Sequence, residues 1–134
     1  EAEQQKFERE FSKEYQLITR EDRLSDIAKD IVEHFMNRGF MGKAMVVSVD
    51  KATAVKMYDK VKRYWNEYIE KLQKDYAKAT DVAKEQIGND LTYMKQTDMA
   101  VVVSQAQNEI EDLKAKGADI TPHRIRMNKE DVDV

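Results

Sequence analysis

The chain has 134 residues, of which 41% are hydrophobic and 37% are charged, and its formal net charge is -3. This length suits one domain with a modest core, and the excess of acid argues against tight nucleic-acid binding by the chain alone, because that affinity depends on neutralising phosphates. The absence of cysteine excludes disulfides and thiolate metal sites, and no apolar run reaches the roughly 18 residues that span a bilayer, so we expect a cytoplasmic protein with no membrane partner.

Two helices are predicted at the start of the chain. Apolar side chains recur at helical spacing on one face of residues 2–18, at Phe7, Phe11, Tyr15 and Ile18. We expect this helix to pack on its own domain, with a face for a bound partner as the alternative. Residues 24–36 carry the clearer i, i+3, i+4, i+7 pattern of a half-buried helix, with Thr19 or Ser25 as its cap and Gly39 at its end.

Two apolar runs rich in β-favouring residues predict strands at 43–49 and 98–103. Each run is continuous rather than alternating, which is typical of strands buried on both faces of a parallel sheet. The connection of roughly 48 residues between them is long enough for the crossover that parallel pairing needs. We therefore expect a helix-rich α/β fold, with a small parallel sheet flanked by long helices.

The connection between these runs is predicted to be helical. Asp50 is placed to accept hydrogen bonds from the first amides of a helix that begins near Lys51 and runs to about Tyr76. Residues 77–96 keep the helical pattern, with Gly88 as a break.

Beyond the second apolar run, residues 104–107 read Ser-Gln-Ala-Gln, a capping box for a helix that ends at Gly117. Residues 118–127 predict an extended connection that carries a small basic cluster of His123, Arg124 and Arg126. This cluster can meet a phosphate, or it can be a solvated loop, and both interpretations stay open.

Aromatic residues follow the long central helix at Tyr58, Tyr64, Trp65, Tyr68 and Tyr76. Base-stacking platforms are usually exposed on sheets or loops, whereas these rings mostly share one helical face. We therefore expect them in the core or between helices.

Catalytic and metal chemistry gain no support from the sequence. Neither His34 nor His123 has metal-ligand spacing to another ligand, and we expect His34 on the surface. No pair of carboxylates is fixed opposite another by its spacing, so general acid–base catalysis is not indicated. The sequence predicts no catalytic residue and no metal ligand.

The turn at residues 48–53 is the strongest candidate site. Backbone amides at a helix N-terminus, with a hydroxyl and a lysine nearby, form a natural cradle for a phosphate, and Ser48, Lys51 and Thr53 supply these groups. The alternative is plain capping by Asp50 beside an exposed lysine, and the two are equally supported. With the two arginines of the basic cluster, these are the candidate DNA-binding residues.

Three long stretches of the chain have a distinctive amino-acid sequence. They are FSKEYQLITREDRLSDIAKDIVEHFMNRG at 11–39, GKAMVVSVDKATAVKMYDKV at 42–61 and MAVVVSQAQNEIEDLKAKGADITPHRIRM at 99–127. In wording and order they resemble the motor subunit of type I restriction enzymes, the restriction (R) subunit. The resemblance covers about residues 7–133 and rests on extended wording rather than on one short motif.

The resemblance implies that residues 1–18 are a helical connector and that residues 19–134 open the second RecA-like motor domain of an ATP-dependent DNA translocase with a separate nuclease domain. DNA and the modification and specificity subunits are its implied partners, and ATP and Mg²⁺ its implied cofactors. The family's Walker lysine, acidic box, arginine finger and nuclease motif have no counterparts here, so we expect no cofactor site and no activity from this chain alone. Because the chain begins with Glu rather than Met, we expect a piece of that longer protein.

Within that family, helicase motif IV is a strand-to-helix turn that contacts the DNA backbone in related motors, and its counterpart here is Val49, Asp50 and Lys51. The family often has Ser where Asp50 stands. Because an acidic group repels a phosphate, the resemblance leaves Lys51 as the better candidate for the contact.

The alternative function is a stand-alone helical module for protein interactions without catalysis. A complete RecA-like domain carries several more strands, so the two strands expected here would leave at least one hydrogen-bonding edge unpaired, which favours pairing with another chain. We therefore expect the isolated chain to form a homodimer that buries apolar helix residues such as Trp65, Ile69 or Leu72.

Overall fold

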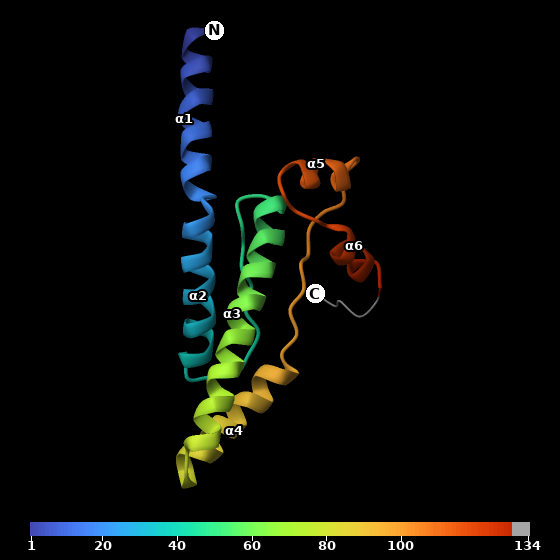
Figure 1. Ribbon diagram of the computed structural model, residues 1–134. Helices are drawn as coiled ribbons and strands as arrows, with labels where there is room; N and C mark the ends of the chain where they lie inside the picture. The colour runs from blue at the N-terminus through green and yellow to red at the C-terminus, as the bar shows by residue number, and fades with distance from the viewer. Residues whose placement is uncertain (130–134) are drawn as a thin grey trace.

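The structure is a computed structural model that describes residues 1–129. These residues form six helices and no strand: α1 (Ala2–Ile18), α2 (Glu21–Asn37), α3 (Lys51–Lys78), α4 (Asp81–Gln96), α5 (Glu109–Ala115) and α6 (Thr121–Met127). Helix α3 is the longest, and α2, α4, α5 and α6 are arranged around it (Figure 1). None of the described helices is long and apolar enough to cross a membrane.

The path of the chain places both ends of α3 in contact with other elements. Helices α2 and α3 run side by side in the same direction, and an extended return segment, residues 38–50, connects them (Figure 1). Helix α4 turns back along the C-terminal half of α3, and residues 97–106 then lead to α5 and α6. Helix α1 continues almost in line with α2 beyond the other helices, and none of its residues is buried.

The predicted parallel sheet is wrong. Residues 43–49 and 98–103 are extended and both run opposite to α3 (Figure 1), but neither forms a strand in the described part of the chain. A strand needs neighbours for its backbone groups, and two short segments offer at most a two-stranded sheet, which is marginal in water. Met45 is 86% exposed, whereas Val101 packs on α3. The chain is therefore all-helical over these residues, not the partial RecA-like α/β domain that we expected.

Three helix boundaries also differ from the prediction. Residues 104–107 lie outside any helix, and α5 starts only after Asn108, which has a left-handed backbone with φ of 56°. Residues 118–127 include α6 rather than forming one extended connection. Pro122 lies in the first turn of α6, where proline is favoured. Gly88 lies inside α4, and the break falls before that helix instead.

The start of α2 lacks the side-chain cap that we predicted. Arg20 occupies the N-cap position, and no side chain accepts a capping hydrogen bond there. Glu21 and Asp22 in the first turn instead place negative charge at the positive end of the helix dipole. At the other end, Gly39 has the predicted left-handed backbone, with φ of 78°.

Two neighbouring clusters of apolar side chains join α2, α3 and α4. Their buried members are Val32, Trp65, Leu72, Leu91 and Met94 in one cluster and Leu24, Ala28 and Met57 in the other. The indole N–H of Trp65 donates to the carbonyl of Met94 at 3.3 Å, which confirms a helix-pairing role for this ring. Because Trp65 and Leu72 are already buried within one chain, they do not offer the dimer surface that we expected. Self-association itself stays a prediction.

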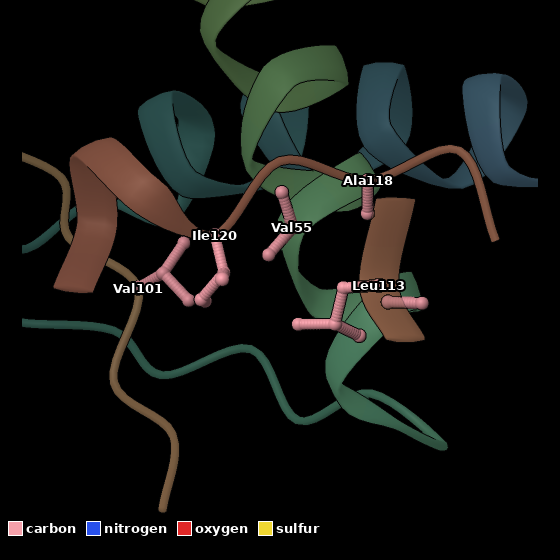
Figure 2. Close-up of a cluster of buried hydrophobic side chains, with 6 residues drawn as sticks. Val55, Val101, Leu113, Ala118 and Ile120 are labelled. Atoms are coloured by element: carbon pink, nitrogen blue, oxygen red, sulfur yellow. The ribbon is translucent and has the colours of Figure 1, made fainter. Parts of the chain in front are cut away.

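A separate cluster attaches the C-terminal part to the N-terminal half of α3. Figure 2 shows Val55, Val101, Leu113, Ala118 and Ile120 gathered around one point, and Ala52 completes the set. These side chains come from α3, from the second extended segment, from α5 and from the connection before α6. Ile120 is 0% exposed, so it is the deepest apolar anchor of this part of the chain.

Candidate nucleic-acid interface

The candidate turn lies where the return segment enters α3. Asp50 is the N-cap residue: its Oδ1 accepts a hydrogen bond from the Thr53 amide at 2.8 Å, and its Oδ2 accepts one from the Tyr15 hydroxyl of α1. Lys116 Nζ lies 4.0 Å from the same carboxylate. Burial raises the pKa of Asp50, but the hydrogen bonds from Thr53 and Tyr15 outweigh it and hold the pKa below its usual value. The carboxylate is therefore charged and tied to three elements.

This geometry matches the capping interpretation of the turn. The Thr53 amide, one of those expected to cradle a phosphate, is occupied by the carboxylate of Asp50. The Thr53 side chain is buried in the N-terminal turn of α3, whereas Ser48 is partly exposed on the return segment. Contact of Ser48 and Thr53 with DNA stays a prediction.

Lys51 presents its charge differently. Its Nζ donates to the backbone carbonyl of Ser104 at 2.7 Å, a residue far along the sequence in the second extended segment. An ammonium group has three N–H donors, and this contact uses one of them. Lys51 is therefore held in place while it retains donors for a further acceptor such as a phosphate oxygen.

Arg124 of α6 is held in a two-point ion pair with Glu109 of α5. Its Nε lies 2.6 Å from Oε1 and its Nη2 lies 2.8 Å from Oε2 of that carboxylate. The guanidinium also donates to the carbonyls of Val103 at 3.4 Å and Ser104 at 3.2 Å. The hydrogen bond from Arg124 lowers the pKa of Glu109, so the pair is fully charged.

Arg126 holds the other end of the same stretch. It forms an ion pair with Asp98 and donates to the carbonyl of Met99 at 2.6 Å. The hydrogen bond from Arg126 lowers the pKa of Asp98. The two arginines of α6 thus form hydrogen bonds near both ends of residues 98–104, which we call the clamped segment.

Of the candidate DNA-binding residues, the structure brings Lys51 and Arg124 together, because both donate to the Ser104 carbonyl. Arg126 lies at the far end of the clamped segment. Glu109 was not identified from the sequence, because two charged residues 15 positions apart show no helical or strand periodicity. Tyr15 was predicted only as an apolar helix position, and its hydroxyl contact was missed for the same reason.

His123 is buried on α6 instead of lying in a solvated loop. Its ring meets Tyr58 of α3 edge-on, with centroids 4.6 Å apart. Burial lowers the pKa of His123 and outweighs the opposing influence of Asp59 and Asp119. His34 is exposed, as predicted.

A cavity of about 210 Å³ lies between the start of α3 and α5. Its charged lining is mixed, with the carboxylates of Asp50, Glu109 and Asp112 against the ammonium groups of Lys51 and Lys116. Within residues 1–129, no group of three metal-ligating side chains is arranged to hold a metal ion.

Comparison with known proteins points to the same family as the resemblance read from the sequence. A stretch of 50 residues is 46% identical to a protein of Methanocaldococcus jannaschii named "Putative type I restriction enzyme MjaIXP endonuclease subunit". The stretch is 36% of this chain and 5% of that protein, so the chain matches a small part of its length. No protein-family model and no solved structure matches the chain.

Proposed function

We propose that this chain is part of the endonuclease subunit of a type I restriction enzyme, and that Lys51 contacts the DNA backbone there. The observation that carries the proposal is the 46% identity over 50 residues to a protein named as such a subunit. The position of Lys51 supports the second half, because its ammonium group is anchored at the start of a helix and keeps free donors.

The activity belongs to the larger protein in this proposal. That subunit translocates DNA in the cytoplasm, uses ATP and Mg²⁺ held by residues outside this chain, and works with modification and specificity subunits. The chain itself supplies a backbone contact and no catalytic group. We therefore expect no ATP hydrolysis and no nuclease activity from the isolated chain, and turnover that a point change within it abolishes would contradict this.

Reading the gene around this segment tests the first half most cheaply. The proposal expects a phosphate-binding loop of the form G-x-x-x-x-G-K-[ST] in the same open reading frame, because ATP-driven motors cradle the triphosphate with that loop. An open reading frame that holds only these helices would reject it.

The Lys51 contact is tested by Lys51→Ala in the complete subunit. Losing one phosphate contact should weaken DNA binding about five-fold near physiological salt and slow translocation, with ATP binding unchanged. Lys29→Ala is the matched control, because Lys29 is an exposed lysine on α2, away from this turn. A translocation rate equal to that of the unmodified subunit would remove Lys51 from the DNA path.

A helical interaction module is the second candidate function, and the exposure of α1 favours it. Helix α1 has no buried residue, and the stacked rings of Phe7 and Phe11 are both exposed. Lone helices of this length are marginal in water, so a covered α1 would be more stable. Full helicity of α1 in the isolated chain, measured by NMR secondary shifts, would show that it needs no partner.

A further inference from the structure

We infer that Arg124 and Glu109 are positioning residues that set where the Lys51 ammonium lies, and that Arg124 does not itself contact DNA. The inference rests on the proposed function, since it explains how the Lys51 contact is built. Its basis is one shared atom: the Ser104 carbonyl oxygen accepts from Lys51 Nζ at 2.7 Å and from Arg124 Nη2 at 3.2 Å.

The guanidinium of Arg124 is directed into the protein. Both edges of its fork are engaged, one by the two oxygens of Glu109 and the other by the carbonyls of Val103 and Ser104. Its side chain is 15% exposed and that of Glu109 is 8% exposed. A phosphate oxygen would have to replace a charged two-point partner, so Arg124 is poorly placed as a DNA ligand.

Ser104 is held from several directions. Glu109 accepts a hydrogen bond from the Ala106 amide at 3.4 Å while it binds Arg124, so the two residues fix the chain on both sides of Ser104. Arg126 fixes the start of the clamped segment at Met99. The Ser104 carbonyl is therefore held by a frame of hydrogen bonds from α5 and α6, although it lies outside any helix.

This frame matters for Lys51 because a lysine side chain is long and flexible. Fixing it costs conformational entropy, and a contact that is already in place before DNA arrives lowers the cost of binding. The Ser104 carbonyl supplies such a contact, and the Glu109 carboxylate is near enough to attract the ammonium group as well. In this arrangement Glu109 orients Arg124, Arg124 holds the Ser104 carbonyl, and that carbonyl positions Lys51.

The test compares Lys51→Gln with the double variant Lys51→Gln/Arg124→Gln in the salt dependence of DNA binding by the complete subunit, with a short duplex as the probe. Each phosphate contact contributes about 0.9 to the slope of log affinity against log salt. Lys51→Gln should reduce the slope by about 1, and adding Arg124→Gln to it should change the slope no further. A total reduction of about 2 in the double variant would show that Arg124 contacts phosphate, and would overturn the inference while leaving the proposed function intact.

Hydrogen exchange in the DNA-free protein provides the second measurement. Arg124→Gln should speed exchange at the amide of Ala106, because Arg124 and Glu109 hold this part of the chain. Lys51→Gln should not speed it, because Lys51 is held by the Ser104 carbonyl and does not hold it in place. Equal exchange in the Arg124 variant and the unmodified protein would overturn the inference. An unchanged salt slope in Lys51→Gln would instead reject the Lys51 contact, and with it both the proposed function of this turn and the positioning role.

Discussion

Individual charged side chains fix how the elements meet at the start of α3. The carboxylate of Asp50 caps this helix through the Thr53 amide, receives the Tyr15 hydroxyl of α1 and lies near Lys116 after α5. The residue that the family resemblance marks as a departure from Ser is thus a junction in this chain. Ser at this position would keep a cap, since Ser and Asp are comparable N-caps, but would lose the charge.

Asp50→Ala should lower the free energy of unfolding by about 1 kcal/mol, because the cap of α3 is lost. Asp50→Asn should retain most of this free energy, since Asn caps helices as well as Asp does. Tyr15→Phe is the companion variant, because it removes the contact with α1 and leaves the cap in place. Urea denaturation of the variants checks this, and equal midpoints for Asp50→Ala and the unmodified chain would contradict it.

His123 should make stability depend on pH in the range just below neutrality. Burial lowers its pKa in the folded state, so the unfolded chain takes up a proton first as the pH falls. Stability is then complete above the unfolded pKa of about 6.5 and declines as the pH falls from there toward the lower folded value. Acidic groups and basic groups both face this ring: Asp59, Asp119, Arg126 and Lys62.

The measurement is chemical denaturation between about pH 5 and pH 7.5, where most carboxylates stay ionised. His123→Phe should remove the pH dependence, because phenylalanine keeps the ring contact with Tyr58 and does not titrate. His34→Gln should retain it, since His34 is exposed on α2. A pH dependence that persists in His123→Phe would assign it to another group.

At the scale of whole elements, helix α4 contains a glycine that its backbone does not need. A Cβ at Gly88 would meet only the edge of the Tyr76 ring, at 3.4 Å, and Tyr76 is itself exposed. Gly88→Ala should therefore raise the free energy of unfolding by about 0.5 to 1 kcal/mol, the usual gain within a helix. Thermal denaturation checks the sign.

Gly117 is the matched control for this substitution. It follows α5 with φ of 79°, a left-handed conformation that alanine adopts with strain. Gly117→Ala should lower stability where Gly88→Ala raises it. If both variants shifted the melting temperature in the same direction, backbone conformation would not be what separates them.

Elements with a local signal could be predicted from the sequence, and elements that depend on distant partners could not. The periodicity of residues 24–36 and the cap at Asp50 act within a few residues, so both predictions are confirmed. The strand at 43–49 failed because β-favouring residues form strands only beside other strands. Helix α6 was missed because seven residues show little period. Among the candidate site residues, Lys51 had a local signal, whereas the Glu109 pairing that holds Arg124 had none.

For the whole molecule, α3 is a common support with two separate attachments. The clusters with α2 and α4 share Val61 and Tyr64. The cluster with α5 and the clamped segment uses other side chains of α3, although its Val55 and Tyr58 lie on either side of Met57 in the sequence. Loss of one attachment should therefore leave the other in place. This arrangement predicts that the C-terminal part can open locally before the rest of the chain unfolds.

Ile120→Ala tests this arrangement against Ile125→Ala. Ile120 is fully buried, so its truncation should cost about 3 kcal/mol and speed hydrogen exchange in α5 and α6 more than in α2. Ile125 is the same residue type on the exposed side of α6, and its truncation should change stability by less than about 0.5 kcal/mol. Uniform acceleration of exchange across all helices in Ile120→Ala would mean that the chain unfolds as one unit.

The exposure of α1 has a mechanical consequence. With none of its residues buried, the direction of this helix is set by the joint at Thr19 and Arg20 and by the Tyr15 hydroxyl on Asp50. The far end of α1 lies about 20 Å from Tyr15, so α1 can act as a lever that pivots at its joint with α2 and moves Asp50 through the Tyr15 contact. A pull on that end is delivered to Asp50, the N-cap residue of α3, one position before Lys51. Tilting α1 and moving the start of α3 are therefore one coupled displacement.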